Sequence, residues 1–326
     1  MSWKSVLPST WIFSAFVVVV FLSPMVLTSP QQSLATRALI FGLMAASLDI
    51  AYGHAGLASL GHAALAGVGG YTAALLIVKH DIDSFWLGAA AAVVVSTIVA
   101  VVFGLLSLRA KGIYFILVTF TLGQMIANLA QQWGVLKSPG VDAVVGVGLP
   151  STGLIDEWTP TTVLRGVLIV VVVAFMAIKR ILGSPFGLAL RGTRDNPARM
   201  EALGYHAWAY QLGAMTVSGA FAGLAGALFA YHSGIIAPNN IGIAASGLLV
   251  LMVILGGSGS TYGALAGGII VTAVQFYASE WSEQRAPMII GAVFIATALF
   301  LRGGLAGAIR RRTRHTEVVI DEPVAS

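Results

Sequence analysis

The residues best suited to chemistry lie in and just before a glycine-rich stretch, Gly53-His-Ala-Gly-Leu-Ala-Ser-Leu-Gly-His62. Asp49, the only acidic residue inside a predicted apolar segment, comes one helical turn earlier, and His54, Ser59 and His62 lie in the stretch itself. A carboxylate at the centre of a membrane helix costs about 2.5–3.5 kcal/mol, so Asp49 should have a partner, for which His54 and His62 are the nearest candidates. Asp49 also falls within one turn of the predicted inner end of its helix, where most of this cost disappears. A structural role and a direct role in transport both remain open.

Two further features concern a path through the membrane. Glycine permits non-helical backbone, which survives at membrane depth only where it is buried in protein or lines a wet cavity. The glycine-rich stretch is therefore a candidate segment of a translocation pathway, and an ordinary cytoplasmic turn is the alternative. Thr121, Gln124 and Asn128 stand at i, i+3 and i+7, on one helical face, which indicates either a pore lining or hydrogen bonds between helices.

The sequence contains none of the common catalytic patterns. We find no His-Glu-x-x-His, no phosphate-binding Gly-x4-Gly-Lys-Ser/Thr and no Gly-x-Ser-x-Gly. The chain also has no cysteine, which excludes disulfides, a thiolate nucleophile and cysteine-ligated metals. We therefore expect a protein that is not an enzyme, with no metal site and no cofactor of its own, and an intramembrane enzyme is disfavoured.

The elements that hold these residues must be membrane helices, because 57% of the 326 residues are hydrophobic and only 10% are charged. A soluble domain carries about 25% charged residues. Apolar runs separated by turn signals predict an all-α, polytopic membrane protein with eight to ten crossings, which leaves no room for a separate soluble catalytic domain. The runs are Thr10–Thr28, Leu34–Tyr52, Leu60–Val78, Phe85–Leu108, Ile113–Trp133, Thr162–Leu182, Trp208–His232, Ile243–Leu255, Gly263–Ser279 and Met288–Leu301.

The basic residues predict the orientation of these helices. The segments between the predicted helices lie alternately on the two sides of the membrane. Those on one side hold most of the 18 Lys and Arg residues, and those on the other, outer side hold the rest, namely Arg37, Lys79, Lys137, Arg165 and Arg285. The positive-inside rule then places both termini in the cytoplasm and explains the net charge of +5 without nucleic acid. We expect a permease domain over residues 1–312 and a disordered cytoplasmic tail over 313–326.

The predicted inner loop over residues 184–206 carries the clearest local signals. Asn196 suits an N-cap, Pro197 the first helical position and Gly204 the residue past the end, which together predict a helix of about seven residues. Such a helix is too short to be stable alone in water. It offers two apolar side chains, Met200 and Leu203, on one face beside the charged Arg199 and Glu201. Docking in the groove of a partner and a plain helical connector are the two interpretations.

Seven motifs occur in a fixed order along the chain. They are Gly53-x-Ala-Gly-x-x-Ser-Leu-Gly-His-Ala-Ala64, Gly70-Tyr-Thr-Ala-Ala-Leu75, Arg109-x-Lys-Gly-Ile-Tyr-Phe115, Ser184-Pro-Phe-Gly187, Arg194-Asp-Asn-Pro197 with Glu201-Ala-Leu-Gly204, Phe221-Ala-Gly-Leu-Ala-Gly-Ala227 and Leu255-Gly-Gly-x-Gly-Ser260. In this order and spacing, from about Leu34 to Leu305, the chain resembles the LivM-type permease subunits of ABC importers for branched-chain amino acids.

The resemblance implies a membrane subunit in the bacterial cytoplasmic (inner) membrane, in contact with lipid. Its partners would be a LivH-like second permease, two cytoplasmic ATP-binding subunits and a periplasmic or lipid-anchored substrate-binding protein. ATP would be bound by the partner subunits. The stretch that matches the coupling loop, which would seat in the ATP-binding subunit, comprises Arg194, Asp195, Asn196, Arg199, Met200, Glu201, Leu203 and Gly204.

The sequence departs from the family pattern near the expected pathway. Leu57 stands where the family usually has Gln, Asp49 where it usually has Asn, and the outer loop reads Lys137-Ser-Pro-Gly-Val-Asp-Ala-Val-Val-Gly146. The cargo therefore stays open between branched-chain amino acids and urea, short amides or aromatic carboxylates. The alternative function is a stand-alone secondary transporter or channel that uses Asp49 and the nearby histidines as a proton relay.

Overall fold

The structure, a computed structural model, describes residues 17–25, 27–139, 141–151, 159–281, 285–300, 304–305 and 307. Eight helical segments in this part of the chain are long and apolar enough to cross a membrane, which agrees with the predicted eight to ten. They are α2 (Ser29–Asp49, continued by the π-helix η3, Ile50–His54), α3 (His62–His80), α4 (Phe85–Ser107), α5 (Ile113–Gln132), α6 (Pro160–Gly183), α9 (Ala207–Ser233), α10 (Ile243–Gly256, preceded by η5, Pro238–Asn240) and α11 (Thr261–Trp281).

The two terminal runs behave differently from the predicted crossings. Of the run Thr10–Thr28, the described residues form a helix over residues 17–22 and the 3-10 turn η2 (Ser23–Met25), and its start lies outside the described residues. The last run forms α12 (Ala286–Phe300), whose 15 residues are fewer than a crossing of about 20 requires. The predicted domain boundary at residue 312 and the tail over 313–326 also lie outside the described residues.

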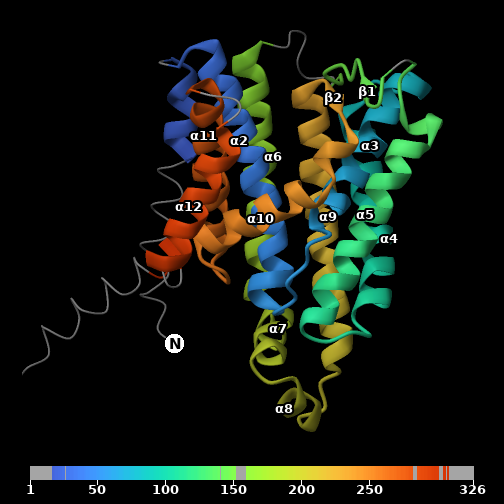
Figure 1. Ribbon diagram of the computed structural model, residues 1–326, viewed down its shortest axis with the longest axis vertical. Coiled ribbons are helices and arrows are strands. Elements are labelled where there is room, and N and C mark those ends of the chain that lie inside the picture. Colours follow the sequence, from blue (N-terminus) through green and yellow to red (C-terminus); the bar gives the residue numbers. More distant parts are fainter. Residues whose placement is uncertain are drawn as a thin grey trace, which may run out of the picture.

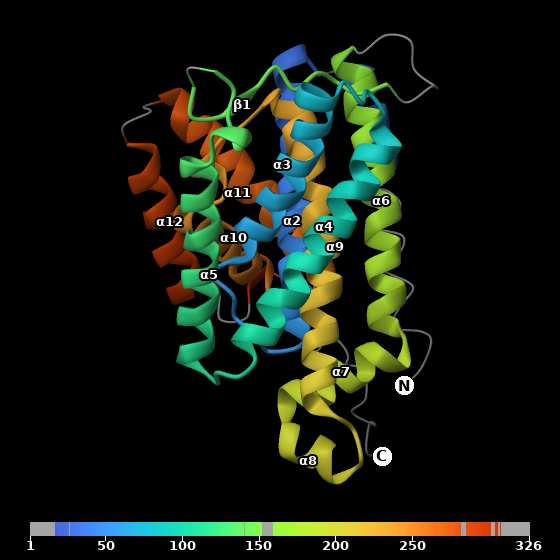
Figure 2. The same cartoon turned by 90° about the vertical axis from the view of Figure 1, so that its right-hand side faces the viewer.

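The helices pack as two groups joined by a short oblique helix. α9 packs along α3 and α4, while α2 packs along α6 and α11 and also touches α9. Figure 1 shows α10 lying across the middle of the bundle at a steep angle to the others, and α7 (Pro185–Asp195) and α8 (Pro197–Ala202) projecting from one end. Figure 2 shows the same pair at the base of α9 and α6. The bundle thus has an α7–α8 end and an opposite end.

Glycines let the helices approach closely at their crossings, as small residues do at contacts between membrane helices. A Cβ on Gly226 of α9 would overlap the carbonyl oxygen of Ala66 on α3, and one on Gly69 of α3 would overlap the backbone of Gly223. A Cβ on Gly268 of α11 would come within 2.6 Å of the Cα of Gly42 on α2. At these places the backbones themselves are in contact, so van der Waals packing between the helices is at its densest.

The end opposite α7 and α8 carries a small sheet that the sequence did not predict. β1 (Val144–Val145), from the long segment between α5 and α6, pairs antiparallel with β2 (Ile235–Ile236), which follows α9. The 3-10 turn η4 (Gly134–Leu136) opens the same segment. The backbone N–H of Ser151 also donates to the Asp83 carboxylate at 3.1 Å. The predicted outer loop is therefore tied to the helix ends around it.

We predict that Gly226→Ala destabilises the protein by at least about 1–3 kcal/mol, because the new methyl group forces α3 and α9 apart. The measurement is thermal unfolding in detergent, followed by size-exclusion chromatography of a fluorescent fusion. Gly247→Ala on α10 is the matched control, because a Cβ there meets no atom within 4 Å. Equal melting temperatures for the two variants would contradict this account of the packing.

Candidate functional site

The predicted short helix is confirmed as α8, at Pro197–Ala202. The Asn196 side chain caps it by accepting a hydrogen bond from the backbone N–H of Arg199 at 3.0 Å, and Pro197 takes the first helical position. Gly204 lies past the end with φ +85°, a left-handed conformation that favours glycine. The sequence signals therefore positioned this element correctly.

The sequence interpretation missed α7, which precedes α8 and anchors it to the bundle. Ser184 followed by Pro185 was an available start signal, because Ser is a favoured N-cap and Pro a favoured first helical residue. One face of α7 is buried, and Leu190 is fully enclosed. Phe186 stacks on Tyr210 of α9 with ring centroids 5.8 Å apart. The predicted loop is thus a two-helix element, residues 184–206, packed on the base of α6 and α9.

The side chains of α8 divide between an inward and an outward direction. Met200 lies over Gly192 of α7, where an added Cβ would come within 2.6 Å of its sulfur. Leu203 is 67% exposed, which leaves it on the open surface. The expectation that Met200 and Leu203 share one docking face is therefore wrong, because α7 occupies the space on the Met200 side. Six side chains of the predicted coupling set are exposed, namely Arg194, Asp195, Asn196, Arg199, Glu201 and Leu203.

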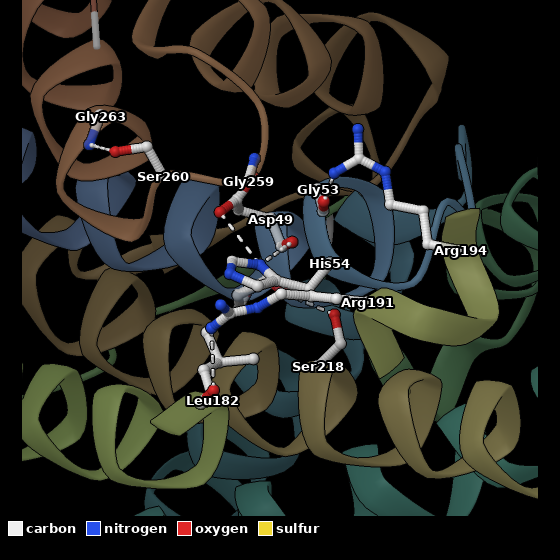
Figure 3. Close-up of polar contacts among 11 residues, drawn as sticks. Asp49, Gly53, His54, Leu182, Arg191, Arg194, Ser218, Gly259, Ser260 and Gly263 are labelled. Carbon is white, nitrogen blue, oxygen red and sulfur yellow. Dashed lines mark hydrogen bonds and ion pairs between the residues drawn. The ribbon is translucent and has the colours of Figure 1, made fainter. Parts of the chain in front are cut away.

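Arg194, at the end of α7, is exposed as well, but its guanidinium is directed toward the bundle. Its guanidinium donates a hydrogen bond to the carbonyl oxygen of Gly53 (Figure 3). The aliphatic part of the same side chain lies against Gly56, where an added Cβ would be 3.1 Å from its Cγ. An added Cβ on Gly259 would be 3.2 Å from the guanidinium. One arginine therefore touches the loop after α2 and the loop after α10.

Asp49, at the end of α2, contacts both η3 and the α10–α11 loop. Its Oδ1 accepts a hydrogen bond from the backbone N–H of Gly259 at 2.7 Å, and its Oδ2 lies 3.5 Å from His54 Nδ1 (Figure 3). His54 Nδ1 also lies 3.1 Å from the carbonyl oxygen of Asp49. We call the group formed by Asp49, Gly53, His54, Arg194 and Gly259 the inner junction. It links residues of α2, α7 and the α10–α11 loop in one hydrogen-bonded unit.

The local backbone explains why this junction forms. α2 does not end at Asp49 but continues through the π-helical turn η3. Such turns are rare and are frequently found at functional sites. A Cβ on Gly53 would overlap the Asp49 carboxylate and the nitrogen of Gly259. Gly259 itself has φ +82°. Both positions therefore require glycine for the carboxylate to reach the amide.

Two sequence expectations about Asp49 need correction. Asp49 is 0% exposed, so it is fully buried and does not lie at a frayed helix end. His54 is a partner as predicted, but His62 is not, because its Nε2 lies 2.9 Å from Ser47 Oγ. Ser59, also buried, accepts a hydrogen bond from the N–H of Gly61 at 3.3 Å. His62, the first residue of α3, and Ser59, shortly before it, therefore contribute to local packing and not to the inner junction.

The polar stripe of α5 is divided. Gln124 and Asn128 line a cavity of about 270 Å³ together with Asn239 and Gly242 of the turn before α10. Thr121 is exposed, donates to the carbonyl oxygen of Leu117 at 2.9 Å and does not line this cavity. Two of the three predicted residues therefore face a common space. None of them reaches the inner junction.

Comparison with known proteins defines the class. The family model for the permease component of branched-chain amino acid transport systems matches residues 32–298, so the chain belongs to this family. It is 25% identical over 299 residues to the high-affinity branched-chain amino acid transport system permease protein LivM of Salmonella typhimurium, covering 85% of this chain and 70% of that protein. The LivM protein of Escherichia coli is likewise 25% identical, over 290 residues that cover 82% and 68% of the two chains. No solved structure matches the chain.

The family fixes what kind of component this is. It is a multi-pass membrane permease of the ABC importer class, a non-catalytic subunit that works with other subunits. Family membership does not favour the alternative of a stand-alone transporter that uses Asp49 and His54 as a proton relay. In the described part of the chain, no group of three or more His, Asp or Glu side chains could hold a metal ion.

We predict that Asp49→Ala loosens the α10–α11 loop, because the N–H of Gly259 loses its hydrogen bond to the Asp49 carboxylate. A hydrogen bond to a charged group contributes about 1.5–3 kcal/mol. Amide hydrogen exchange of the peptide around residues 257–261 should then speed up by about tenfold or more. Asp49→Asn is the control, because an amide oxygen still accepts from Gly259. Unchanged exchange in the alanine variant would show that this bond does not hold the loop.

Proposed function

We propose that this chain is the LivM-type permease subunit of an ATP-driven importer that carries branched-chain aliphatic amino acids across the bacterial cytoplasmic membrane. Its partners would be a LivH-like second permease, two cytoplasmic ATP-binding subunits and a periplasmic or lipid-anchored binding protein that delivers the solute. The observation that carries the proposal is the inner junction. In it, Arg194 of α7 donates to Gly53 of η3, and Asp49 of α2 accepts from Gly259 of the α10–α11 loop, so the projecting α7–α8 element is connected to both. A permease driven from outside needs such an attachment.

The orientation follows from charge. The connection between α4 and α5, which carries Arg109 and Lys111, lies at the same end of the bundle as α7 and α8, which also carry basic residues (Figure 2). Cytoplasmic segments are enriched in Lys and Arg. We therefore assign the α7–α8 end to the cytoplasm, where ATP is available to partner subunits.

The coupling route has three steps. The exposed face of α8, with Glu201 and Leu203, docks in the ATP-binding subunit, which is the groove-binding mode open to a short capped helix. α7 passes the motion inward because its apolar face is packed on the bundle. Arg194 then moves the loops that hold Gly53 and Gly259. Packed interfaces of this kind switch between discrete arrangements, so a small shift at α8 becomes a change of access at the membrane helices.

The functional test is uptake by proteoliposomes that contain this permease with its second permease and ATP-binding subunits. We predict that leucine accumulates only when ATP and the binding protein are present, and that vanadate stops it. Leucine accumulation by this chain alone, driven by a proton gradient, would contradict the proposal.

Glu201→Arg should reduce uptake by about tenfold or more, because a reversed charge on a docking face costs several kcal/mol. Membrane insertion and folding should be unaffected, since Glu201 is exposed on α8. The matched control is Glu280→Arg, an exposed acid at the other end of the bundle, on α11. Normal uptake by a well-expressed Glu201→Arg protein would remove α8 from the coupling route.

Arg194→Ala should separate ATP hydrolysis from transport. The ATP-binding subunits still dock on α8, so hydrolysis continues, but uptake falls because the inner loops lose their link to α7. The ratio of solute moved to ATP hydrolysed is the measurement. Arg199→Ala is the control for loss of positive charge, because Arg199 is exposed on α8. A ratio that is equal in the two variants would show that Arg194 does not transmit the motion.

A further inference from the structure

A second and larger cavity lies between the two groups of helices, on the other side of α10 from the Gln124–Asn128 cavity. Its volume is about 410 Å³, within the range of roughly 300–1,000 Å³ in which small-molecule sites fall. Residues of α2, α3, α9, α10, α11 and α12 contribute to its walls. Asn239 and Ala244 line both this cavity and the one beside α5, so the two spaces adjoin at the start of α10.

Among the residues that the structure describes, Arg37 is the only cationic side chain that lines this cavity. The sequence counted Arg37 among the outer basic residues. In the structure it lies two turns inside α2, which starts at Ser29, roughly 12 Å along the helix axis. The guanidinium lies 5.7 Å from the ring centroid of Phe41, which also lines the cavity. Among the described residues it has no ion-pair or hydrogen-bond partner. The Arg37 side chain is exposed and lines the cavity, so a ligand that brings a carboxylate can reach its guanidinium.

Gln275 of α11 supplies a hydrogen-bond acceptor, which complements the donor groups of Arg37. It lines the same cavity, and its Oε1 is buried with no hydrogen-bond partner in the described part of the chain. A buried acceptor without a donor is unfavourable, so this oxygen favours a ligand that carries N–H groups. Most of the remaining wall is apolar and includes Met44, Phe229, Leu248 and Leu249. The lining therefore combines the Arg37 cation, the Gln275 acceptor, the amides of Asn239 and Asn240 and an apolar surface.

We propose that this space, the Arg37 cavity, is a transit site for a zwitterionic α-amino acid with an aliphatic side chain. The Arg37 guanidinium binds the carboxylate through paired N–H···O bonds, and Gln275 Oε1 accepts a hydrogen bond from the ammonium group. The aliphatic side chain lies on the apolar face of α10. The inference rests on the proposed function, since it assigns the solute of that function to specific residues. It also provides a reason for the solute to be an amino acid and not urea or a simple amide, which carry no carboxylate.

The natural absence of cysteine allows a direct test, because a single introduced thiol is then the only reactive one. Ala245→Cys places it in the cavity wall, and His80→Cys places a control thiol outside the cavity, at the exposed end of α3. The rate of modification by a water-soluble thiosulfonate reagent is measured on the permease in lipid nanodiscs. The probes are L-leucine, L-leucinamide, which lacks the carboxylate, and 4-methylpentanoate, which lacks the ammonium group.

We expect L-leucine to slow modification at Ala245→Cys, and both truncated probes to need concentrations about tenfold or more higher for equal protection. None should protect His80→Cys. Arg37→Gln should weaken protection by leucine about tenfold or more and abolish the preference for leucine over leucinamide. Gln275→Leu should also weaken protection by leucine, whereas Gln275→Glu, which retains the acceptor, should preserve it. Arg165→Gln, which removes another membrane-embedded arginine, should leave it unchanged, since Arg165 does not line the cavity.

Equal protection by leucine and leucinamide, or full protection by leucine in Arg37→Gln, would overturn the assignment of the cavity. Arg37→Lys keeps the charge and serves as the second variant if Arg37→Gln does not reach the membrane. Unchanged protection by leucine in Arg37→Lys would also contradict binding of the carboxylate through paired hydrogen bonds. ATP-driven leucine uptake by the assembled wild-type importer is measured in parallel. Uptake without protection would leave the proposed function standing and remove only the Arg37 cavity. Protection without any ATP-driven uptake would remove the importer proposal and keep the binding site.

Discussion

The inner junction is the constraint on which the rest of the structure depends. The carboxylate of Asp49 holds the N–H of Gly259, and the guanidinium of Arg194 holds the carbonyl of Gly53, so two loops and one surface helix are tied at one point. A buried carboxylate is stable only when it is hydrogen-bonded, and Asp49 is fully buried. The Asp49 carboxylate therefore needs the N–H of Gly259. Without the junction, α7 would still pack on α6 and α9, but it would have no direct hold on the loops that begin α3 and α11.

α10 connects this junction to the spaces in the bundle. Its last residue, Gly256, leads directly into the loop that contains Gly259, while its first turns lie between the Arg37 cavity and the cavity lined by Gln124. The helix has only 14 residues and crosses the bundle obliquely (Figure 1). Elsewhere glycines bring helix backbones into contact, as at Gly226 and Ala66, so these helices have little room to move relative to one another. A displacement of Gly259 would therefore move α10 against a stiff frame, and the cavity walls on both sides of it would change together.

The sequence predicted the parts of this arrangement that local physics controls. Apolar runs located the crossings, and Asn196 with Gly204 located α8, because capping acts within one turn. The pairing of Asp49 with His54 was also within reach, at five residues' separation. The bond from Asp49 to Gly259 spans 210 positions, and no local pattern encodes such a contact. His62 was assigned to the wrong partner for the same reason, because the packing of α3 on α2 decides that it meets Ser47.

The central claim is that the α7–α8 element and the α10–α11 loop move as one body. Spin labels at Ala202→Cys and Ser258→Cys, both exposed positions in a chain without other cysteines, give the distance within that body, and Ala202→Cys with His80→Cys gives its distance from the opposite end. The measurement is double electron–electron resonance on the assembled importer, with and without ATP and vanadate. The account predicts that the first distance stays constant while the second changes. A change in the first distance with the second fixed would contradict it.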